Sequence, residues 1–370
     1  MSTIRLSAPW FGDAEVEAVA RVLKSQKVGM GAEVKQFEAE LLSFFGRNDT
    51  NISCVSSCTA AIHLSLQACG IGQGDEVLVP TLTFVSTFQA VRATGARPIP
   101  CDIDLDDGFI DLDDARSRIT RNTKAIVPVL FAGCDWKIDR LQQLAEDYGL
   151  KIIEDAAHSF GNENIASRDS VLCFSFDAIK NISCGDGGAI LTSDDEVANK
   201  IKDIRLLGVI GDTDLRFQGK RSWDFDVTEQ GWRYHMNDIS AAIGRAQLAK
   251  FPLIKQKRQA NARIYMDRLL PISQISLFPI NAKTAVPHIF PIIVKNGRRD
   301  DLKDFLARNG IETGIQYKPN HLLSLFNLGY NLPKAMKLYG SILSIPVHPL
   351  LSEEDITFVA NCIKKFFVSN

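Results

Sequence analysis

Short apolar runs alternate with helical patterns through the first 250 residues of the chain. The runs with the length and composition of strands are Ile52–Val55, Val77–Val79, Ala125–Leu130, Lys151–Glu154, Val171–Phe176 and Ala189–Thr192. Helical stretches between them include Thr59–Cys69, Thr83–Ala93 and Ile138–Tyr148. This alternation predicts crossover units that build a mostly parallel sheet covered by helices on both faces.

Two amphipathic helices are predicted ahead of the first strand. Asp13 can cap the first, whose apolar positions on one face are Val16, Val19 and Leu23. The second follows Gly29-Met30-Gly31, with apolar positions at Val34, Phe37, Leu41 and Phe44. We expect both helices to pack through these positions.

The pattern changes from about Phe251. We predict helices at Pro252–Leu269, Asp300–Asn309 and Ser352–Phe367, and strands at His288–Val294 and Ile311–Tyr317. Ser352 is the expected cap of the last helix, since three acidic residues follow it. The chain is therefore expected to form a large α/β domain over residues 1–250 and a smaller C-terminal α/β domain over residues 251–370.

Composition narrows the class of protein. The 370 residues are 45% hydrophobic, and 42 Lys and Arg against 44 Asp and Glu give a net charge of −2, which lacks the basic excess of a nucleic-acid binder. No apolar run approaches the ~20 residues that span a bilayer, and the first residues show no signal peptide. Eight cysteines without a CxxC pair are typical of reduced thiols. We expect a cytoplasmic protein with no membrane or nucleic-acid partner.

Two other kinds of site are disfavoured by spacing. The six histidines show no metal-binding spacing with each other or with cysteines, so no metal is expected. The run from Gly70 to Gly74 imitates a dinucleotide fingerprint, but it follows a helix and precedes a strand, the reverse of the required order. We interpret it as a helix stop and a turn.

A single lysine lies in a loop between two apolar strands, within the segment VLCFSFDAIKNISCGDGGAI at 171–190. Apolar surroundings lower the pKa of a lysine, and a neutral amine is the nucleophile that Schiff-base chemistry requires. The following glycines allow backbone to pass close to a ligand. Lys180 is thus a candidate catalytic residue, although a loop lysine that reaches solvent fits the same pattern.

A carboxylate ends the strand 25 residues upstream, where the chain reads KIIEDAAHSFG. In doubly wound sheets ligands bind beyond the carboxyl ends of the strands, which is where Asp155 falls. Such a carboxylate can hold the ring nitrogen of pyridoxal phosphate protonated. The alternative is that Asp155 caps a helix and His158 packs against the sheet.

A third candidate element is the segment Ser56–Ala61, which opens a predicted helix with small residues. Free N–H groups at a helix N-terminus can bind phosphate, although an ordinary cap has the same sequence. Phe84, which follows the strand Val77–Val79, can stack on a flat ring or pack in the core.

Together and in this order, these elements resemble the DegT/StrS-like sugar aminotransferases. The resemblance covers nearly the whole chain, and the segments that carry it include SSCTAAIHL, GDEVLVPTLTFVST, IIEDAAHSFG, FSFDAIKNISCGDGG, GWRYHMNDISAAIGRAQL and GIETGIQYKPNH. It implies the aspartate-aminotransferase type of fold (pyridoxal-phosphate-dependent transferase fold type I). It also implies a homodimer with shared active sites, and pyridoxal phosphate as cofactor.

The resemblance also implies residue roles. Lys180 would bind the cofactor covalently, Asp155 would pair with the ring nitrogen and His158 would neighbour the ring hydroxyl. The ring would stack on Phe84. The residues expected around the phosphate are Cys58, Thr59, Ala60 and Ser175.

The chain departs from the family pattern in three places. Asp186 replaces a glutamate, Cys58 replaces glycine or alanine, and Arg233 replaces an asparagine expected to reach the partner subunit's phosphate. Arg233 can itself bind phosphate or form a structural ion pair. With Tyr317 and His321, Arg233 is a candidate for the sugar side of the site, and packing roles remain open for all three.

The expected activity is amino transfer to a keto-sugar. By resemblance the donor is glutamate, and the acceptor is a nucleotide-linked 4-keto-6-deoxyhexose used in polysaccharide or deoxyaminosugar biosynthesis. One rival is a dehydratase on the same fold, in which histidine replaces the lysine. Another is a non-catalytic regulator, which would tolerate the loss of Lys180 or Asp155. The presence of both residues argues against these rivals.

Overall fold

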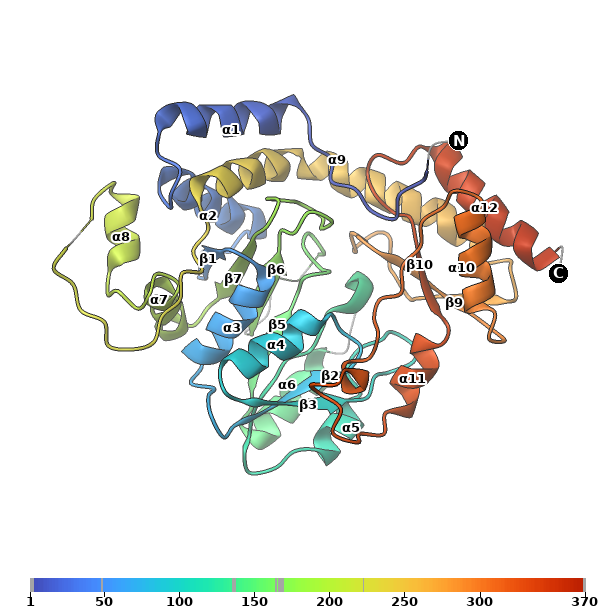
Figure 1. Cartoon of the computed structure of the whole chain (residues 1–370), viewed down its shortest axis with the longest axis horizontal. Coiled ribbons are helices and arrows are strands. Elements are labelled where there is room, and N and C mark those ends of the chain that lie inside the picture. Colours follow the sequence, from blue (N-terminus) through green and yellow to red (C-terminus); the bar gives the residue numbers. More distant parts are fainter. Residues whose placement is uncertain are drawn as a thin grey trace.

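The computed structural model describes residues 3–47, 49–134, 138–163, 165, 170–221 and 223–368. In this part of the chain, Figure 1 shows a large and a smaller sheet spanned by one long helix, α9 (Asp238–Leu269). The large sheet has seven strands in the order β1-β7-β6-β5-β4-β2-β3. In chain order they are β1 Asn51–Val55, β2 Glu76–Pro80, β3 Arg97–Cys101, β4 Thr123–Ile126, β5 Lys151–Asp155, β6 Val171–Ser175 and β7 Gly188–Thr192.

The pairing of the strands places their carboxyl ends at one edge of the sheet, as expected. β7 is antiparallel to both β1 and β6, and every other neighbouring pair is parallel. The carboxyl ends of six strands and the start of β7 therefore share one edge. The mostly parallel sheet is confirmed. The strand β3 was not predicted because Pro98 and Pro100 interrupt it, and proline is tolerated at the edge position that β3 occupies.

Helices cover both faces of the sheet, as predicted. In β2, Val77 and Val79 join the hydrophobic cluster of α3 (Cys58–Ala68), α4 (Val85–Ala93) and α7 (Asp195–Ile204). Leu78 between them joins the cluster of α2 (Ala32–Phe45), α6 (Ile138–Tyr148) and α9. Because successive strand side chains point to opposite faces, a single strand such as β2 contributes to both clusters. Gly70 and Gly74, both with positive φ, form the predicted turn between α3 and β2.

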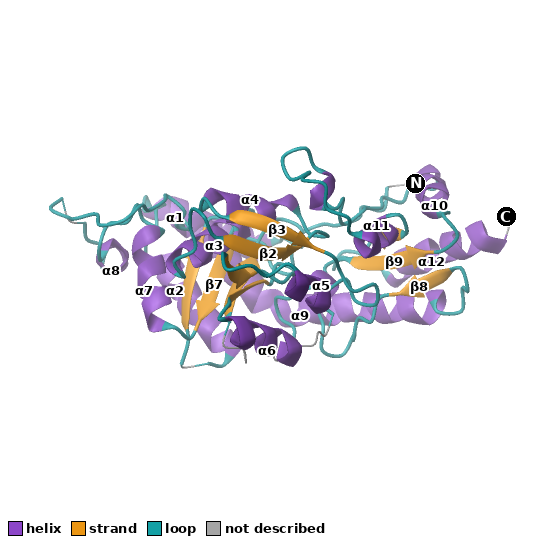
Figure 2. Ribbon diagram, turned by 90° about the horizontal axis from the view of Figure 1, so that it is seen from below, coloured by secondary structure: helices purple, strands orange, loops and turns teal. Residues whose placement is uncertain are grey.

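The smaller sheet lies at the end of the molecule opposite α8 (Figure 2). Its antiparallel strands, in the order β10-β9-β8, are β8 Ile275–Leu277, β9 Phe290–Val294 and β10 Ile342–Ile345. The remaining helices are α1 Asp13–Ser25, α5 Leu112–Ser117, α8 Asp212–Phe217, α10 Arg299–Arg308, α11 Pro333–Tyr339 and α12 Glu353–Val368. The Ser352 hydroxyl accepts the Asp355 N–H at 3.1 Å, which confirms the predicted cap of α12.

Two predictions for the C-terminal part are wrong. No strand forms at 311–317, where Ile311 and Gly314 make only isolated bridges to different segments, at Ile4 and Ser344. The long helix begins at Asp238 rather than Pro252. Asn237 caps it by accepting the Ser240 N–H, and Pro252 lies inside it. Packing of the buried residues of α9 offsets the loss of the one backbone hydrogen bond that a proline removes. The domain boundary at 250/251 stays a prediction, and α9 runs across it.

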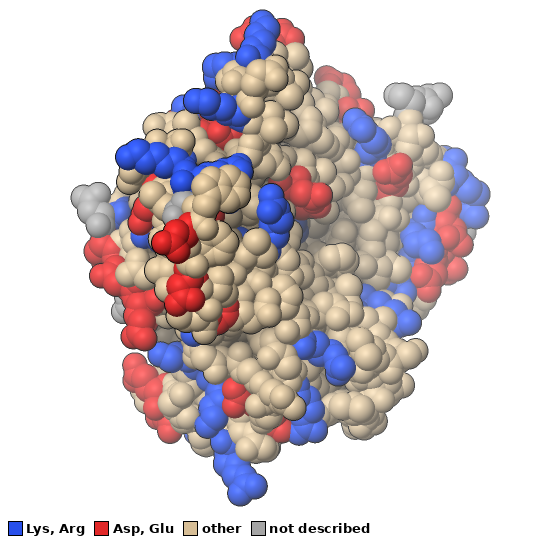
Figure 3. All heavy atoms as spheres, turned by 60° about the vertical axis from the view of Figure 1, so that its left-hand side comes forward, with Lys and Arg blue, Asp and Glu red and all other residues tan. Residues whose placement is uncertain are grey.

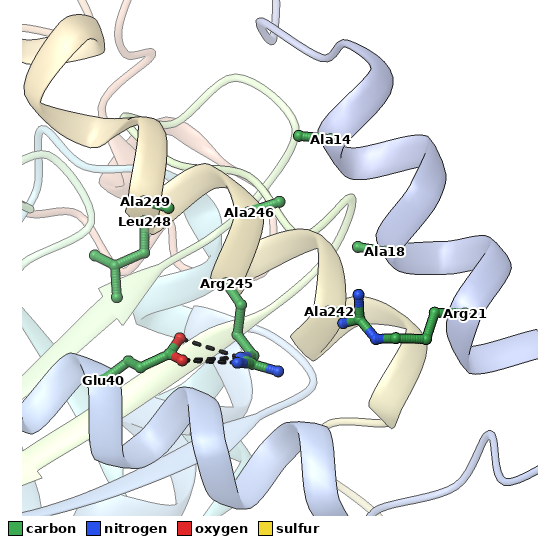
Figure 4. A pocket seen from close by; sticks show the side chains of 9 residues that line it. All are labelled: Ala14, Ala18, Arg21, Glu40, Ala242, Arg245, Ala246, Leu248 and Ala249. Atoms are coloured by element: carbon green, nitrogen blue, oxygen red, sulfur yellow. Dashed lines mark hydrogen bonds and ion pairs between the residues drawn. The ribbon is translucent and has the colours of Figure 1, made fainter. Parts of the chain in front are cut away.

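The predicted packing face of α1 is also wrong. Gly12 rather than Asp13 caps the helix, and its N–H donates to Glu15. Glu15, Ala18 and Val22 are buried, whereas Val16 and Leu23 are 66% and 50% exposed. Figure 4 shows the cause: α1 lies beside α9 with alanines of both helices around a pocket of about 430 Å³.

Two further observations concern the described part of the chain as a whole. All eight cysteines lie in it, and none of them is paired in a disulfide. Among its helices, none combines the length and apolar character needed to cross a membrane.

Candidate active site

A cavity of about 280 Å³ opens at the edge of the large sheet where the carboxyl ends of the parallel strands meet. Residues that follow β1, β2, β5 and β6, or precede β7, line it. Eight of the predicted site residues are among them: Cys58, Thr59, Phe84, Asp155, His158, Ser175, Lys180 and Tyr317. Segments more than 250 residues apart in the sequence therefore meet in one place, as the doubly wound topology predicts.

Asp155 is a buried carboxylate at the end of β5. Its Oδ2 accepts a hydrogen bond from the Thr87 hydroxyl at 2.8 Å, and its Oδ1 accepts from the Ala157 N–H at 3.2 Å. The Cys58 thiol lies 3.9 Å from Oδ1. Burial raises the pKa of Asp155, while its hydrogen bonds and the positive charge of Lys180 lower it in part. A cationic group in the cavity would stabilise this carboxylate.

Lys180 approaches the cavity from the loop between β6 and β7. Its N–H donates to the Asp177 carbonyl, and its Nζ lies 3.3 Å from His288 Nε2. Burial lowers the pKa of the Lys180 amine, while Asp155 acts in the opposite direction. Lys180 lines the cavity rather than lying on the outer surface. Its surroundings favour the neutral, nucleophilic form.

The hydrogen bonds of His158 fix its tautomer. Nδ1 lies 3.2 Å from the Ala132 backbone N–H and must accept from it, so the ring proton is on Nε2. Nε2 then donates to the Tyr317 hydroxyl at 3.1 Å. Burial and the nearby Lys180 lower the pKa of His158, which keeps the ring neutral.

The N-terminus of α3 forms a third side of the cavity. Ser57 caps the helix and accepts the Ala60 N–H at 3.1 Å, so the Ala60 amide is already engaged and Ala60 lies outside the lining. Cys58 and Thr59 are the first residues of α3 and line the cavity. A Cβ at Gly188 would lie 2.6 Å from the Ser57 carbonyl carbon, so β7 and this loop fit together only with glycine there. The positive end of the helix dipole suits a phosphate.

The remaining predicted residues divide into two groups. The ring of Phe84 is not a core side chain: it is 57% exposed, lines the cavity and lies 5.8 Å from the Tyr317 ring. His321 is buried outside the lining, with Nδ1 2.8 Å from the Thr81 hydroxyl. Arg233 is exposed, also outside the lining, on a segment that bridges to Leu206. Within one chain, only Tyr317 of the three proposed sugar-side residues reaches the cavity.

Sequence reasoning missed two residues that contact the central pair. Thr87 lies one turn into α4, and its contact with Asp155 depends on how α4 packs on the sheet. His288 lies 108 residues from Lys180 and was counted only as the start of a predicted strand. Thr87 ends the segment GDEVLVPTLTFVST, which carries the resemblance but assigns no role to this threonine, and His288 belongs to none of the segments that carry it.

The donor set fits one kind of group. The cavity presents an amine with a lowered pKa, a buried carboxylate with a raised pKa and a helix N-terminus. These features suit an aldehyde carbon, a protonated ring nitrogen and a phosphate. These are the reactive parts of pyridoxal phosphate. The fold and the site thus define a pyridoxal-phosphate enzyme with the aspartate-aminotransferase type of fold.

The chain belongs to the DegT/DnrJ/EryC1/StrS aminotransferase family, whose model matches residues 10–364. It is 33% identical to the uncharacterized protein MJ1066 of Methanocaldococcus jannaschii, over 98% of this chain and 97% of that protein. Among solved structures, it is similar to PseC of Helicobacter pylori, an aminotransferase involved in the biosynthesis of pseudoaminic acid (TM-score 0.90, 26% identity, 100% of both chains). It is also similar to Spr1654 of Streptococcus pneumoniae, a candidate sugar aminotransferase solved in its PLP form (TM-score 0.89, 27% identity, 99% of both chains).

These comparisons confirm four of the expectations. The family, the fold type, the class of enzyme (a pyridoxal-phosphate-dependent sugar aminotransferase) and the cofactor are those that the sequence predicts. The roles of individual residues, the sugar and the amino donor are matters for proposal.

Proposed function

We propose that this enzyme transfers an amino group from glutamate to the keto group of a nucleotide-linked 4-keto-6-deoxyhexose. The observation that carries the proposal is the presence of Lys180 and Asp155 in the lining of one cavity, with the N-terminus of α3 beside them. The involvement of PseC in the biosynthesis of pseudoaminic acid supports a sugar acceptor. A product of this kind serves polysaccharide or deoxyaminosugar biosynthesis.

Each residue of the cavity has a defined task in this proposal. Pyridoxal phosphate, when bound, supplies an electron sink that stabilises a carbanion at the α-carbon of the donor. Lys180 would hold the cofactor covalently, and its Nζ would carry the proton from the α-carbon of the donor to C4′ of the cofactor, first as general base and then as general acid. Asp155 keeps the ring nitrogen protonated, while Thr87 and Ala157 hold the carboxylate in place.

The other residues bind and orient. Cys58 and Thr59 at the N-terminus of α3, with Ser175 at the end of β6, line the cavity and would hold the phosphate. Phe84 would stack on the ring, and the neutral His158, held by Ala132 and Tyr317, would neighbour the ring hydroxyl. Tyr317 faces the same cavity and is the best placed of the sugar-side candidates. The lysine itself disfavours the dehydratase alternative, in which histidine takes its place.

Absorbance of the bound cofactor tests the reaction directly. We expect the purified holoenzyme to lose the visible band of the lysine-bound cofactor on addition of glutamate. The band should return when the correct keto-sugar is added. A panel of nucleotide-linked 3-keto and 4-keto sugars then identifies the acceptor. Loss of the band with glutamate and no recovery with any keto-sugar would contradict the proposed acceptor class.

We also propose a homodimer with shared active sites. The segment 207–221 and 223–233, which contains α8, extends from the body at the end opposite the smaller sheet (Figures 1 and 2). It exposes large apolar side chains at Leu207, Ile210, Trp223, Phe225 and Val227. Figure 3 brings this end of the molecule forward, and its charged side chains are interspersed with uncharged surface. The same segment carries Arg233, which in a dimer is available to the phosphate of the partner's site.

Changing the largest exposed side chain of that segment tests the dimer. Trp223 is 87% exposed, so Trp223→Ser removes no packing inside the subunit. Loss of a buried interface tryptophan costs about 2 kcal/mol or more, so we expect the dimer dissociation constant to rise at least about tenfold. Sedimentation velocity measures this dissociation constant. Tyr148→Ser, on the exposed side of α6, is the matched control; equal dimerisation of all three proteins would refute the interface.

A further inference from the structure

His288 connects the smaller part of the molecule to the amine of Lys180. It lies two residues before β9, its side chain is buried and only 2% of the residue is exposed. Its Nε2 lies 3.3 Å from Lys180 Nζ, and its ring centre lies 4.3 Å from that of His158. The two rings and the amine form one contiguous cluster beside the cavity.

The other ring nitrogen of His288 restricts the proton arrangement of this cluster. Within the described part of the chain, Nδ1 of His288 is buried and has no hydrogen-bond partner. If Lys180 donated to Nε2, the ring proton of a neutral His288 would lie on Nδ1, and a buried N–H would be unpaired. If the proton lies on Nε2, it points at the Lys180 nitrogen, and only an acceptor lone pair is left unpaired. Buried unpaired N–H groups are rarer than under-satisfied acceptors, so the second arrangement is preferred.

Burial and Arg258 favour the neutral form of both side chains, while the acidic groups around Lys180 act in the opposite direction. The His288 ring faces Lys180, His158 and Arg258, and Lys180 in turn faces Asp155, Cys58, Asp177 and Arg258. Arg258 of α9 is fully buried and donates to the carbonyls of Lys180, Pro287 and Val347. Its positive charge lies near both groups and disfavours a second or third cation there.

We propose that His288 is a positioning residue that donates its Nε2–H to the lone pair of the Lys180 amine and thereby holds that amine neutral and oriented toward the cavity. An ammonium group would meet an N–H donor at 3.3 Å and be repelled, so this contact opposes protonation of Lys180. The proposal deepens the proposed function, since it concerns the same lysine. It assigns no bond making to His288.

Modification of Lys180 by cyanate tests this proposal without turnover. Cyanate carbamylates neutral amines, and peptide mass spectrometry reports the modified fraction at Lys180 alone. The full-length chain is saturated with pyridoxamine phosphate, which leaves the Lys180 amine free, and the rate is followed from pH 6 to 10. In His288→Ala water replaces the donor, so the pH midpoint should rise by about one unit and the rate at pH 7.5 should fall about tenfold. His288→Gln, which retains an N–H donor, should stay within about threefold of wild type.

A second buried histidine provides the matched control. His63 of α3 packs against Trp232, away from Lys180, and His63→Ala should leave the pH midpoint of Lys180 unchanged. Circular dichroism checks that each variant folds. A wild-type midpoint in a folded His288→Ala protein would overturn the proposal, and so would equal losses in the Ala and Gln variants, because packing alone would then explain the effect. Labelling requires neither the keto-sugar acceptor nor the amino donor. A failure of the proposal for His288 is therefore distinguishable from a failure of the proposed reaction.

Discussion

Lys180→Ala is expected to abolish covalent attachment of the cofactor and to slow amino transfer by about 10²–10⁴-fold, the usual contribution of a positioned general acid or base. The cavity keeps its carboxylate and its helix N-terminus in this variant, so the cofactor should still bind without a covalent link. The visible band of the lysine-bound cofactor should be absent from its spectrum. Steady-state amino transfer with the identified keto-sugar gives the rate.

Two controls separate the chemistry of Lys180 from its charge. Lys180→Arg retains a cation, but a guanidinium is not a neutral nucleophile, so we expect a loss as large as that of the alanine variant. Lys151→Ala changes a lysine at the other end of β5, away from the cavity, and should retain wild-type activity. Turnover near the wild-type rate in Lys180→Ala would contradict the assigned role.

Asp155→Asn is expected to lower the rate of amino transfer by about 10–100-fold. The substitution keeps the size of the side chain and its contact with the Ala157 N–H, but it removes the negative charge. A hydrogen bond to a charged group contributes about 1.5–3 kcal/mol, which corresponds to this range of rates. The absorbance of the bound cofactor should change at the same time, since its ring nitrogen loses the partner that keeps it protonated.

Asp186→Asn is the matched control for this experiment. Asp186 also contributes a carboxylate to the cavity lining, but it is exposed and lies in the loop before β7. We expect a rate within about threefold of wild type. If both variants lost activity equally, charge in the cavity as a whole, rather than pairing at Asp155, would be responsible.

Local sequence patterns predicted the parts of the fold that local forces determine. The strands β1, β2, β5, β6 and β7 and the helix α6 agree with the predicted ranges within about two residues. Asp155 and Lys180 could be assigned because each follows an apolar strand, and parallel topology brings such positions to one edge. The errors arose where tertiary packing overrides local pattern. Helix α1 buries Glu15, Ala18 and Val22 and exposes the predicted packing positions Val16 and Leu23. Helix α9 continues through Pro252.

Site residues that depend on contacts between distant segments could not be predicted from the sequence. No motif assigns a role to Thr87 or His288, and only the packing of α4 on the sheet and of β9 beside the cavity brings them to Asp155 and Lys180. The buried position of His321 is of the same kind, because its hydrogen bond to Thr81 joins residues 240 positions apart. Arg233 lies outside the cavity of its own chain, so the proposed contact of Arg233 with a phosphate requires a second subunit.

The central claim is that the cofactor is carried by the amine of Lys180, next to Asp155. Reduction of the purified holoenzyme with borohydride, followed by proteolysis and peptide mass spectrometry, measures this directly. The account predicts that the mass of reduced pyridoxal phosphate is found on the peptide that contains Lys180, at that residue. Attachment to any other lysine, or no attachment in a protein that has retained its cofactor, would contradict it.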